Sequence, residues 1–177
     1  PSPAVAAGPA AASGPAPAAC PPPRAVWRLS FGFVVVGPMC DAGWAFQHDT
    51  GRKEREKALG AKVTTKYIGH VPEGADAERV IRELAATGHN LIFTTSFGYM
   101  NPTIKVAGTF PKVNFEHATG YKTGKNVGIY NARFYEGRYL AGMVAGKMSK
   151  TNVAGSIAAF TNPQVSMDRN TVAHGIR

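Results

Sequence analysis

Long apolar runs are absent from this sequence. None approaches the roughly 20 residues that a helix needs to cross a bilayer, which argues against a membrane-spanning helix. Cysteine is rare, with only Cys20 and Cys40, and two thiols do not define a compartment because they can form one disulfide in an oxidising space or stay unrelated. Acidic residues are also scarce: 11 Asp and Glu stand against 20 Lys and Arg, which gives a formal net charge of +9.

The sequence patterns of common catalytic and cofactor sites are missing as well. The five histidines show no metal-ligand spacing, and Ser96 has no Gly-x-Ser-x-Gly pattern around it. No Gly-x-Gly-x-x-Gly follows the first apolar run, so a dinucleotide site has no support. We therefore expect no enzymatic activity, no cofactor and no metal. A hydrolase that uses Cys40, with His48 or His117 as its base, is the weaker alternative.

The positive charge allows two interpretations. A basic protein can bind nucleic acid or an anionic membrane surface, or it can simply carry a solvated basic surface. Lys and Arg are spread along the chain, and the densest cluster, Arg52 to Lys57, is interrupted by Glu54 and Glu56 as on an exposed helix face. We favour the solvated surface and expect no nucleic-acid partner.

The first part of the chain differs in composition from the rest. Pro1 to Arg24 consists almost entirely of Pro, Ala, Gly and Ser, with no apolar periodicity, so we expect residues 1–28 to form a disordered tract. It has neither the basic start nor the leucine-rich core of a signal peptide. Cys20 follows two alanines, as a lipid-attachment cysteine does, but Pro17 stands where such sites carry Leu.

Strand and helix signals alternate after this tract. β-branched and alternating apolar runs predict strands at Phe31–Val36, Val63–Ile68, Leu91–Thr95, Val113–His117, Val127–Tyr130 and Val153–Phe160. Apolar stripes and terminal glycines predict helices at Trp44–Leu59, Pro72–Thr87, Pro102–Phe110 and Arg133–Met148. This alternation predicts an α/β fold with a parallel, Rossmann-like sheet and helical crossovers.

The end of the chain predicts a further element. Small residues in the last predicted helix would let it lie close to the sheet, and Asn162-Pro163 begins what looks like another crossover. An α/β domain would not normally stop at Arg177, so we expect the polypeptide to be incomplete.

Two loops after predicted strands carry the candidate binding residues. The first presents Asp41 and Trp44, and the second contains Ser96, Phe97, Gly98, Tyr99 and Asn101. In the common doubly wound order, strands one and three are neighbours, so both loops would line one crevice at the carboxyl ends of the strands. Aromatic rings there can stack on a flat ligand, while a carboxylate and an amide can hydrogen-bond its edge.

Each of these residues also has a purely structural interpretation. Trp44 could be a hydrophobic staple at a helix start, Asp41 a helix cap, and Phe97 a side chain that packs under its own loop. Because both loops follow strands of one predicted sheet, we favour the binding interpretation for the set as a whole.

Longer strings in the same regions resemble the basic membrane protein family. These are the substrate-binding lipoproteins of bacterial ABC importers, typically receptors for purines or nucleosides. The strings that carry the resemblance are GPMCDAGW at residues 37–44, VPEGADAERVIRELA at 71–85, IFTTSFGYM at 92–100, FEHATGYKT at 115–123 and RFYEGRYLAGMVAGKM at 133–148.

The resemblance implies a type I periplasmic-binding-protein fold, in which two α/β lobes hold the ligand between them. It implies a first, ligand-binding lobe at residues 29–160, and a crossover at 161–177 to a second lobe that is largely missing. It also implies an ABC permease as partner, a place in the periplasm or on the outer face of the cell membrane, and membrane contact only through a lipid anchor. A sensory binding module is the alternative within this fold.

The resemblance extends to individual positions. Asp41 matches the acidic residue of the first loop and Trp44 matches the stacking aromatic. Phe97 and Gly98 match the loop after the third strand, and Asn101 stands where relatives often have Asp. The residues expected to bind a purine or nucleoside are therefore Asp41, Trp44, Ser96, Phe97, Gly98, Tyr99 and Asn101.

Overall fold

The computed structural model describes residues 28–40 and 42–177. The predictions for the Pro/Ala-rich tract up to residue 27, for Cys20 and for Asp41 fall outside these described residues. Within the described residues, no helix is both long and apolar enough to cross a membrane.

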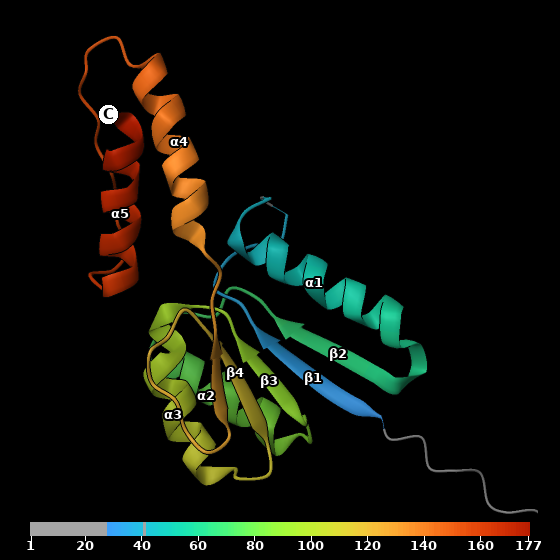
Figure 1. The fold of residues 1–177 in the computed structure, drawn as a ribbon. Helices are drawn as coiled ribbons and strands as arrows, with labels where there is room; N and C mark the ends of the chain where they lie inside the picture. The colour runs from blue at the N-terminus through green and yellow to red at the C-terminus, as the bar shows by residue number, and fades with distance from the viewer. Residues whose placement is uncertain (1–27, 41) are drawn as a thin grey trace, which may run out of the picture.

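Five parallel strands form a single sheet in the order β2-β1-β3-β4-β5 (Figure 1). They are β1 (Leu29–Val34), β2 (Val63–Ile68), β3 (Leu91–Thr94), β4 (Asn114–Ala118) and β5 (Val127–Tyr130). The register brings the strand ends level: Val34 is opposite both Ile68 and Thr94, and Thr94 is opposite His117. The predicted parallel α/β fold, with strands one and three as neighbours, is confirmed.

Helices cover both faces of this sheet (Figure 1). Helices α2 (Ala75–Ala86) and α3 (Met100–Thr109) pack on the face that contains Val34, where the larger core cluster includes Ile81, Leu84 and Phe115. Helix α1 (Trp44–Leu59) covers the face that contains Phe33 and Val35. Successive residues of β1 thus point to opposite cores, as expected of a strand buried on both sides.

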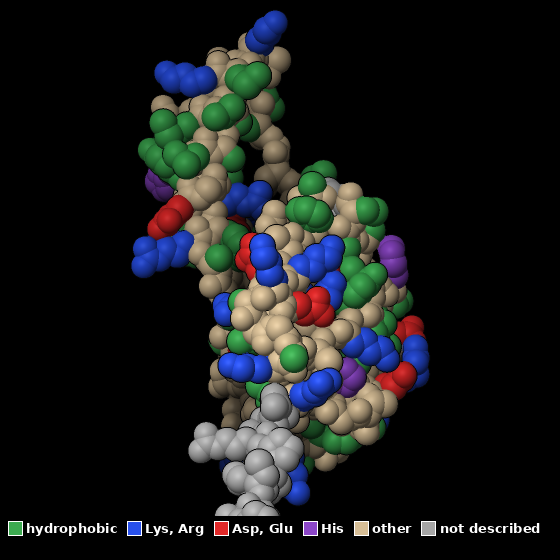
Figure 2. All heavy atoms as spheres, turned by 90° about the vertical axis from the view of Figure 1, so that its right-hand side faces the viewer, with side chains coloured by type: hydrophobic (Ala, Val, Ile, Leu, Met, Phe, Trp, Pro, Cys, Tyr) green, Lys and Arg blue, Asp and Glu red, His purple; other side chains and the backbone are tan. Residues whose placement is uncertain are grey.

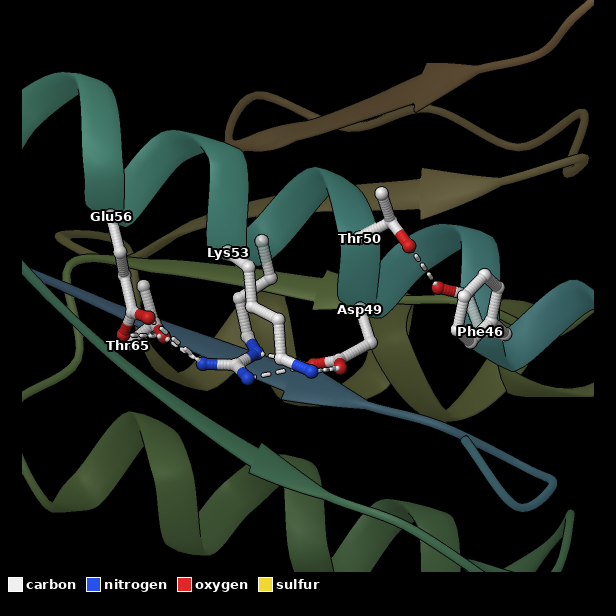
Figure 3. Close-up of polar contacts among 7 residues, drawn as sticks. Phe46, Asp49, Thr50, Lys53, Glu56 and Thr65 are labelled. Atoms are coloured by element: carbon white, nitrogen blue, oxygen red, sulfur yellow. Dashed lines mark hydrogen bonds and ion pairs between the residues drawn. The ribbon is translucent and has the colours of Figure 1, made fainter. Parts of the chain in front are cut away.

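A charged network fixes α1 to the sheet edge (Figure 3). Asp49 is only 6% exposed, and it accepts hydrogen bonds from Arg52 Nε at 2.8 Å and pairs with Lys53 Nζ at 2.8 Å. Arg52 also donates to the Thr65 hydroxyl of β2 at 2.7 Å. Burial alone would raise the pKa of Asp49, but the hydrogen bonds and charges of Lys53 and Arg52 outweigh it and hold that pKa below its usual range.

The two remaining helices stand together, apart from the sheet (Figure 1). They are α4 (Phe134–Met148) and α5 (Pro163–Ile176), and glycines lie at their contact. A Cβ on Gly142 would lie 2.4 Å from the Val172 carbonyl oxygen, and one on Gly175 would lie 2.2 Å from that of Tyr139. The small residues of α4 therefore permit close packing on a helix, and the expectation that they face the sheet was wrong.

A pair of matched substitutions tests this contact. Gly142→Ala should destabilise the α4–α5 pair by about 1–3 kcal/mol, because its methyl group has no room against the α5 backbone. Gly137→Ala, on the same helix, meets nothing within 4 Å and should be neutral or stabilising by up to about 1 kcal/mol. Amide hydrogen exchange in α4 and α5 measures both effects, and equal protection in the two variants would show that the close contact is unimportant.

The strand predicted at Val153–Phe160 is not formed. These residues are irregular, and Val153 and Ile157 are 77% and 105% exposed. An isolated strand cannot satisfy its backbone groups, and this segment pairs with neither edge of the described sheet. Figure 2 shows exposed hydrophobic side chains over the helix pair, and basic and acidic side chains interspersed on the sheet body.

Candidate functional site

Two adjacent cavities lie where the carboxyl ends of the strands meet the starts of α1 and α4. The first has a volume of about 300 Å³, and its walls include His48, Tyr130 and Asn131. The second has a volume of about 360 Å³, and its walls include Ser96, Phe97 and Asp168. Three side chains line both cavities and so lie between them: Trp44, Thr119 and Phe134.

Trp44 is fixed between these cavities. Its indole N–H donates a hydrogen bond to the Thr95 carbonyl at the end of β3, and its ring lies 5.6 Å from that of Phe134 and 4.7 Å from that of His48. The side chain is still 38% exposed. The loop after β1 and the loop after β3 therefore face one space, with an accessible aromatic surface in it.

The loop after β3 is shaped by Glu73, which the sequence analysis did not single out. The Ser96 hydroxyl and the Gly98 backbone N–H both donate to the Glu73 carboxylate. A Cβ on Gly98 would lie 2.2 Å from Glu73 Cδ, so a larger residue there would displace the Glu73 carboxylate from this position. Phe97 is left to line the second cavity, with its ring 5.1 Å from that of Phe160.

Among the predicted ligand residues that the structure describes, three line neither cavity: Gly98, Tyr99 and Asn101. Tyr99 is fully buried in the core, and its hydroxyl donates to the Val71 carbonyl at 2.6 Å. Burial, with a smaller contribution from Glu73, raises the pKa of Tyr99. The Asn101 amide oxygen, at the exposed start of α3, accepts a hydrogen bond from Lys122 Nζ at 2.8 Å. The Tyr99 and Asn101 side chains are therefore engaged in contacts within the protein, away from the two cavities.

The alternative of a cysteine hydrolase gains no geometric support. Cys40 is an exposed free thiol. His48 bonds to the carbonyl of Trp44, and His117 lies in the core, where its Nδ1 is 2.9 Å from the Thr94 hydroxyl. Neither His48 nor His117 lines the cavity that contains Cys40. Within the described residues, no group of three or more His, Cys, Asp or Glu side chains could hold a metal ion.

Tyr130 and Phe134 line the first cavity without having been predicted as site residues, and His48, considered from the sequence only as a base for Cys40, lines it too. His48 follows Trp44 by four residues, a spacing that places both side chains on one face of a helix, and this signal could have found it. Tyr130 is the last residue of β5 and Phe134 is the first residue of α4. Whether α4 reaches the cavity wall depends on how the chain turns between these two residues. Burial raises the pKa of Tyr130 and lowers that of His48, so both groups are neutral at neutral pH.

Comparison with known proteins assigns the family. Residues 29–177 match the sequence profile of the PnrA-like ABC transporter substrate-binding proteins, the Bmp family. The chain belongs to this family. The match covers the sheet, both cavities and the helix pair, so the resemblance inferred from the strings in both loops is confirmed.

Two curated relatives of the Bmp chain carry ligand names. A purine-binding protein of Brucella abortus is 55% identical over 148 residues, which are 84% of this chain and 42% of the relative. A protein of Haloferax volcanii, named for glucose binding in ABC transport, is 38% identical over 149 residues, which are 84% of this chain and 38% of the relative. The chain thus spans about two fifths of the length of these relatives.

Solved structures agree on the fold. A solute-binding protein from Aeropyrum pernix aligns with a TM-score of 0.69 and 23% identity, over 84% of this chain and 42% of that one. Another from Conexibacter woesei aligns with a TM-score of 0.63 and 24% identity, over 84% of this chain and 50% of that one. A transcriptional activator of the comK gene from Bacillus halodurans aligns with a TM-score of 0.61 and 27% identity, over 83% and 49% of the two chains.

Proposed function

We propose that this Bmp-family chain is part of the substrate-binding component of an ABC importer and that it binds a purine base or nucleoside. The identity of 55% to a purine-binding protein supports the ligand class. The site suits a flat heterocycle, because Trp44, Phe97, Tyr130 and Phe134 surround the two cavities with aromatic surface.

One observation carries the proposal. The Trp44 indole separates the two cavities and is partly exposed, and its hydrogen bond to Thr95 holds it in place. A fixed and accessible indole loses little conformational freedom when a base stacks on it, so stacking is retained as net affinity. The ligand site proposed here therefore consists of Trp44, Ser96 and Phe97, which line the second cavity, together with Asp41 and Gly98, for which the family resemblance is the support.

The wider assignment rests on the family. We propose that residues 29–160 contribute the first lobe, that residues 161–177 lead toward a second lobe, and that the ligand is held between the two. A periplasmic or outer-surface location, a lipid anchor and an ABC permease as partner follow from the family's role in import. Absence of enzymatic activity is part of the same proposal.

A sensory role is the second candidate. It is favoured by the similarity to a protein described as a transcriptional activator, at 27% identity. The same cavities would serve such a module, since recognition of the ligand precedes either output. Permease and ATPase genes beside the coding sequence would support import, and a regulatory gene in their place would support sensing.

Calorimetry on the full-length protein tests the ligand class. Adenine, guanine, hypoxanthine, adenosine and inosine are titrated alongside glucose, which tests the ligand named for the Haloferax relative. We expect at least one purine to bind with micromolar or tighter affinity and glucose to give no heat. Glucose binding without purine binding would contradict the proposed ligand class.

A further inference from the structure

His48 lies in the wall of the first cavity between two aromatic rings. Its imidazole centroid is 4.7 Å from the Trp44 ring and 6.0 Å from the Tyr130 ring. Besides the Tyr130 hydroxyl, the other polar side chains in this wall are Gln47, Thr119 and Asn131, while the remaining lining is largely apolar. His48 is therefore positioned to offer a directional contact in a cavity that otherwise provides mainly stacking and apolar surface.

The tautomer of His48 follows from its hydrogen bond. Nδ1 lies 2.9 Å from the Trp44 carbonyl oxygen, one turn earlier on α1. Because a carbonyl can only accept, Nδ1 must carry the proton and donate it. In a neutral ring, Nε2 then holds a lone pair and can only accept.

The remaining nitrogen is available for a ligand. Burial lowers the pKa of His48 below its ordinary value, so the neutral ring dominates at neutral pH. Among the residues that the structure describes, Nδ1 is the ring atom with a hydrogen-bond partner. Nε2 lies across the ring from Nδ1, so a ring that bonds its own helix through Nδ1 directs Nε2 away from that helix.

We propose that His48 Nε2 is a hydrogen-bond acceptor for an N–H group of the bound base, and that His48 thereby selects among flat ligands by their donors. This inference rests on the proposed function and adds a specificity residue to it. Stacking on Trp44 accepts any π-face, so it distinguishes poorly between bases. A site with a fixed acceptor discriminates more strongly, because an analogue without the donor leaves that acceptor unpaired.

A cycle of ligand and protein changes tests the inference. Adenine is compared with 9-methyladenine, which lacks the ring N–H, and with purine, which lacks the amino group, by calorimetry on the full-length protein. In the unmodified protein, one of these two analogues should bind roughly tenfold more weakly than adenine or worse. In His48→Leu that same difference should largely disappear, because the acceptor is gone.

Conservative and control variants separate recognition from structure. His48→Gln offers an amide oxygen near the position of Nε2 and should retain most of the difference between adenine and the weaker analogue. His89→Gln is the matched control, since His89 Nδ1 also contacts the carbonyl of its preceding helix, at 2.9 Å from Leu84, but it lies at the amino end of β3. It should leave the ligand ratios unchanged.

The outcomes are distinguishable. If adenine binds and His48→Leu preserves both analogue ratios, the inference is wrong and the proposed function stands. If no purine or nucleoside binds the unmodified protein, the proposed function fails and the inference fails with it.

Discussion

Trp44→Ala is expected to weaken purine binding by roughly ten- to a hundredfold, whereas Trp44→Phe should retain most of the affinity. Stacking of a base on an aromatic side chain contributes about 1–3 kcal/mol, and each 1.4 kcal/mol corresponds to a factor of ten. Phenylalanine keeps an aromatic face but loses the N–H that bonds to the Thr95 carbonyl. The loss of affinity in Trp44→Phe therefore measures how much the hydrogen bond that holds the ring in place contributes to binding.

A neighbouring aromatic residue provides the control for this result. Phe46 lies on the same helix and is 39% exposed, against 38% for Trp44, but it does not line either cavity. Phe46→Ala should leave the affinity unchanged. Equal affinities in Trp44→Ala and Phe46→Ala would remove the physical basis of the site, whatever the family likeness.

Acidification from pH 6.5 to pH 4 is expected to reduce the free energy of unfolding by about 3 kcal/mol through His117 alone. Burial lowers the pKa of this histidine to about 4, from an ordinary value of 6.5. Between pH 6.5 and pH 4 the His117 ring is protonated in the unfolded chain but stays largely neutral in the folded chain. Protonation therefore favours the unfolded state, and stability falls as the pH falls.

Urea unfolding at several pH values measures this effect, and two variants assign it. His117→Leu should flatten the dependence between pH 6.5 and 4, because the titrating ring is gone. His174→Gln, at an exposed position on α5, should leave the slope as it is. The lowered pKa of His48 acts in the same direction. The lowered pKa of Asp49 stabilises the folded state above pH 3.8, and that stabilisation is lost mainly as the pH falls below this value. An unchanged slope in His117→Leu would contradict the assignment.

The sheet could be predicted from sequence because its signals are local. The β2 strand, at Val63–Ile68, coincides with its prediction, and the α1 bounds, Trp44–Leu59, do so too. The prediction that β1 and β3 are adjacent in the sheet followed from the usual strand order of doubly wound sheets. Residues 153–160 have an equally strong apolar pattern, but a strand also needs a paired neighbour, and that requirement is not written in the segment itself.

The site was harder to predict, because its side chains are placed by distant partners. Tyr99 is of a residue type that often contacts flat ligands, yet its hydroxyl donates to the Val71 carbonyl inside the core. Glu73 bonds to Ser96 and Gly98 although it lies 23 and 25 residues earlier in the chain. No pattern in the sequence near Tyr99 or Glu73 predicts these contacts. The position of His48 was accessible, since its spacing from Trp44 is a helical one.

Because all the described strands of the sheet are parallel, one end of the sheet carries the cavities, and the opposite end can accept changes in sequence. Every cavity residue comes from the carboxyl ends of strands or from segments beyond them, while the short helix Gly60–Lys62 and residues 87–90 and 110–113 lead into strands at the opposite edge. Peptide tags or fluorophores attached at these connections would sit a full strand length from any bound molecule. They are the places at which a reporter protein could be built without altering what it detects.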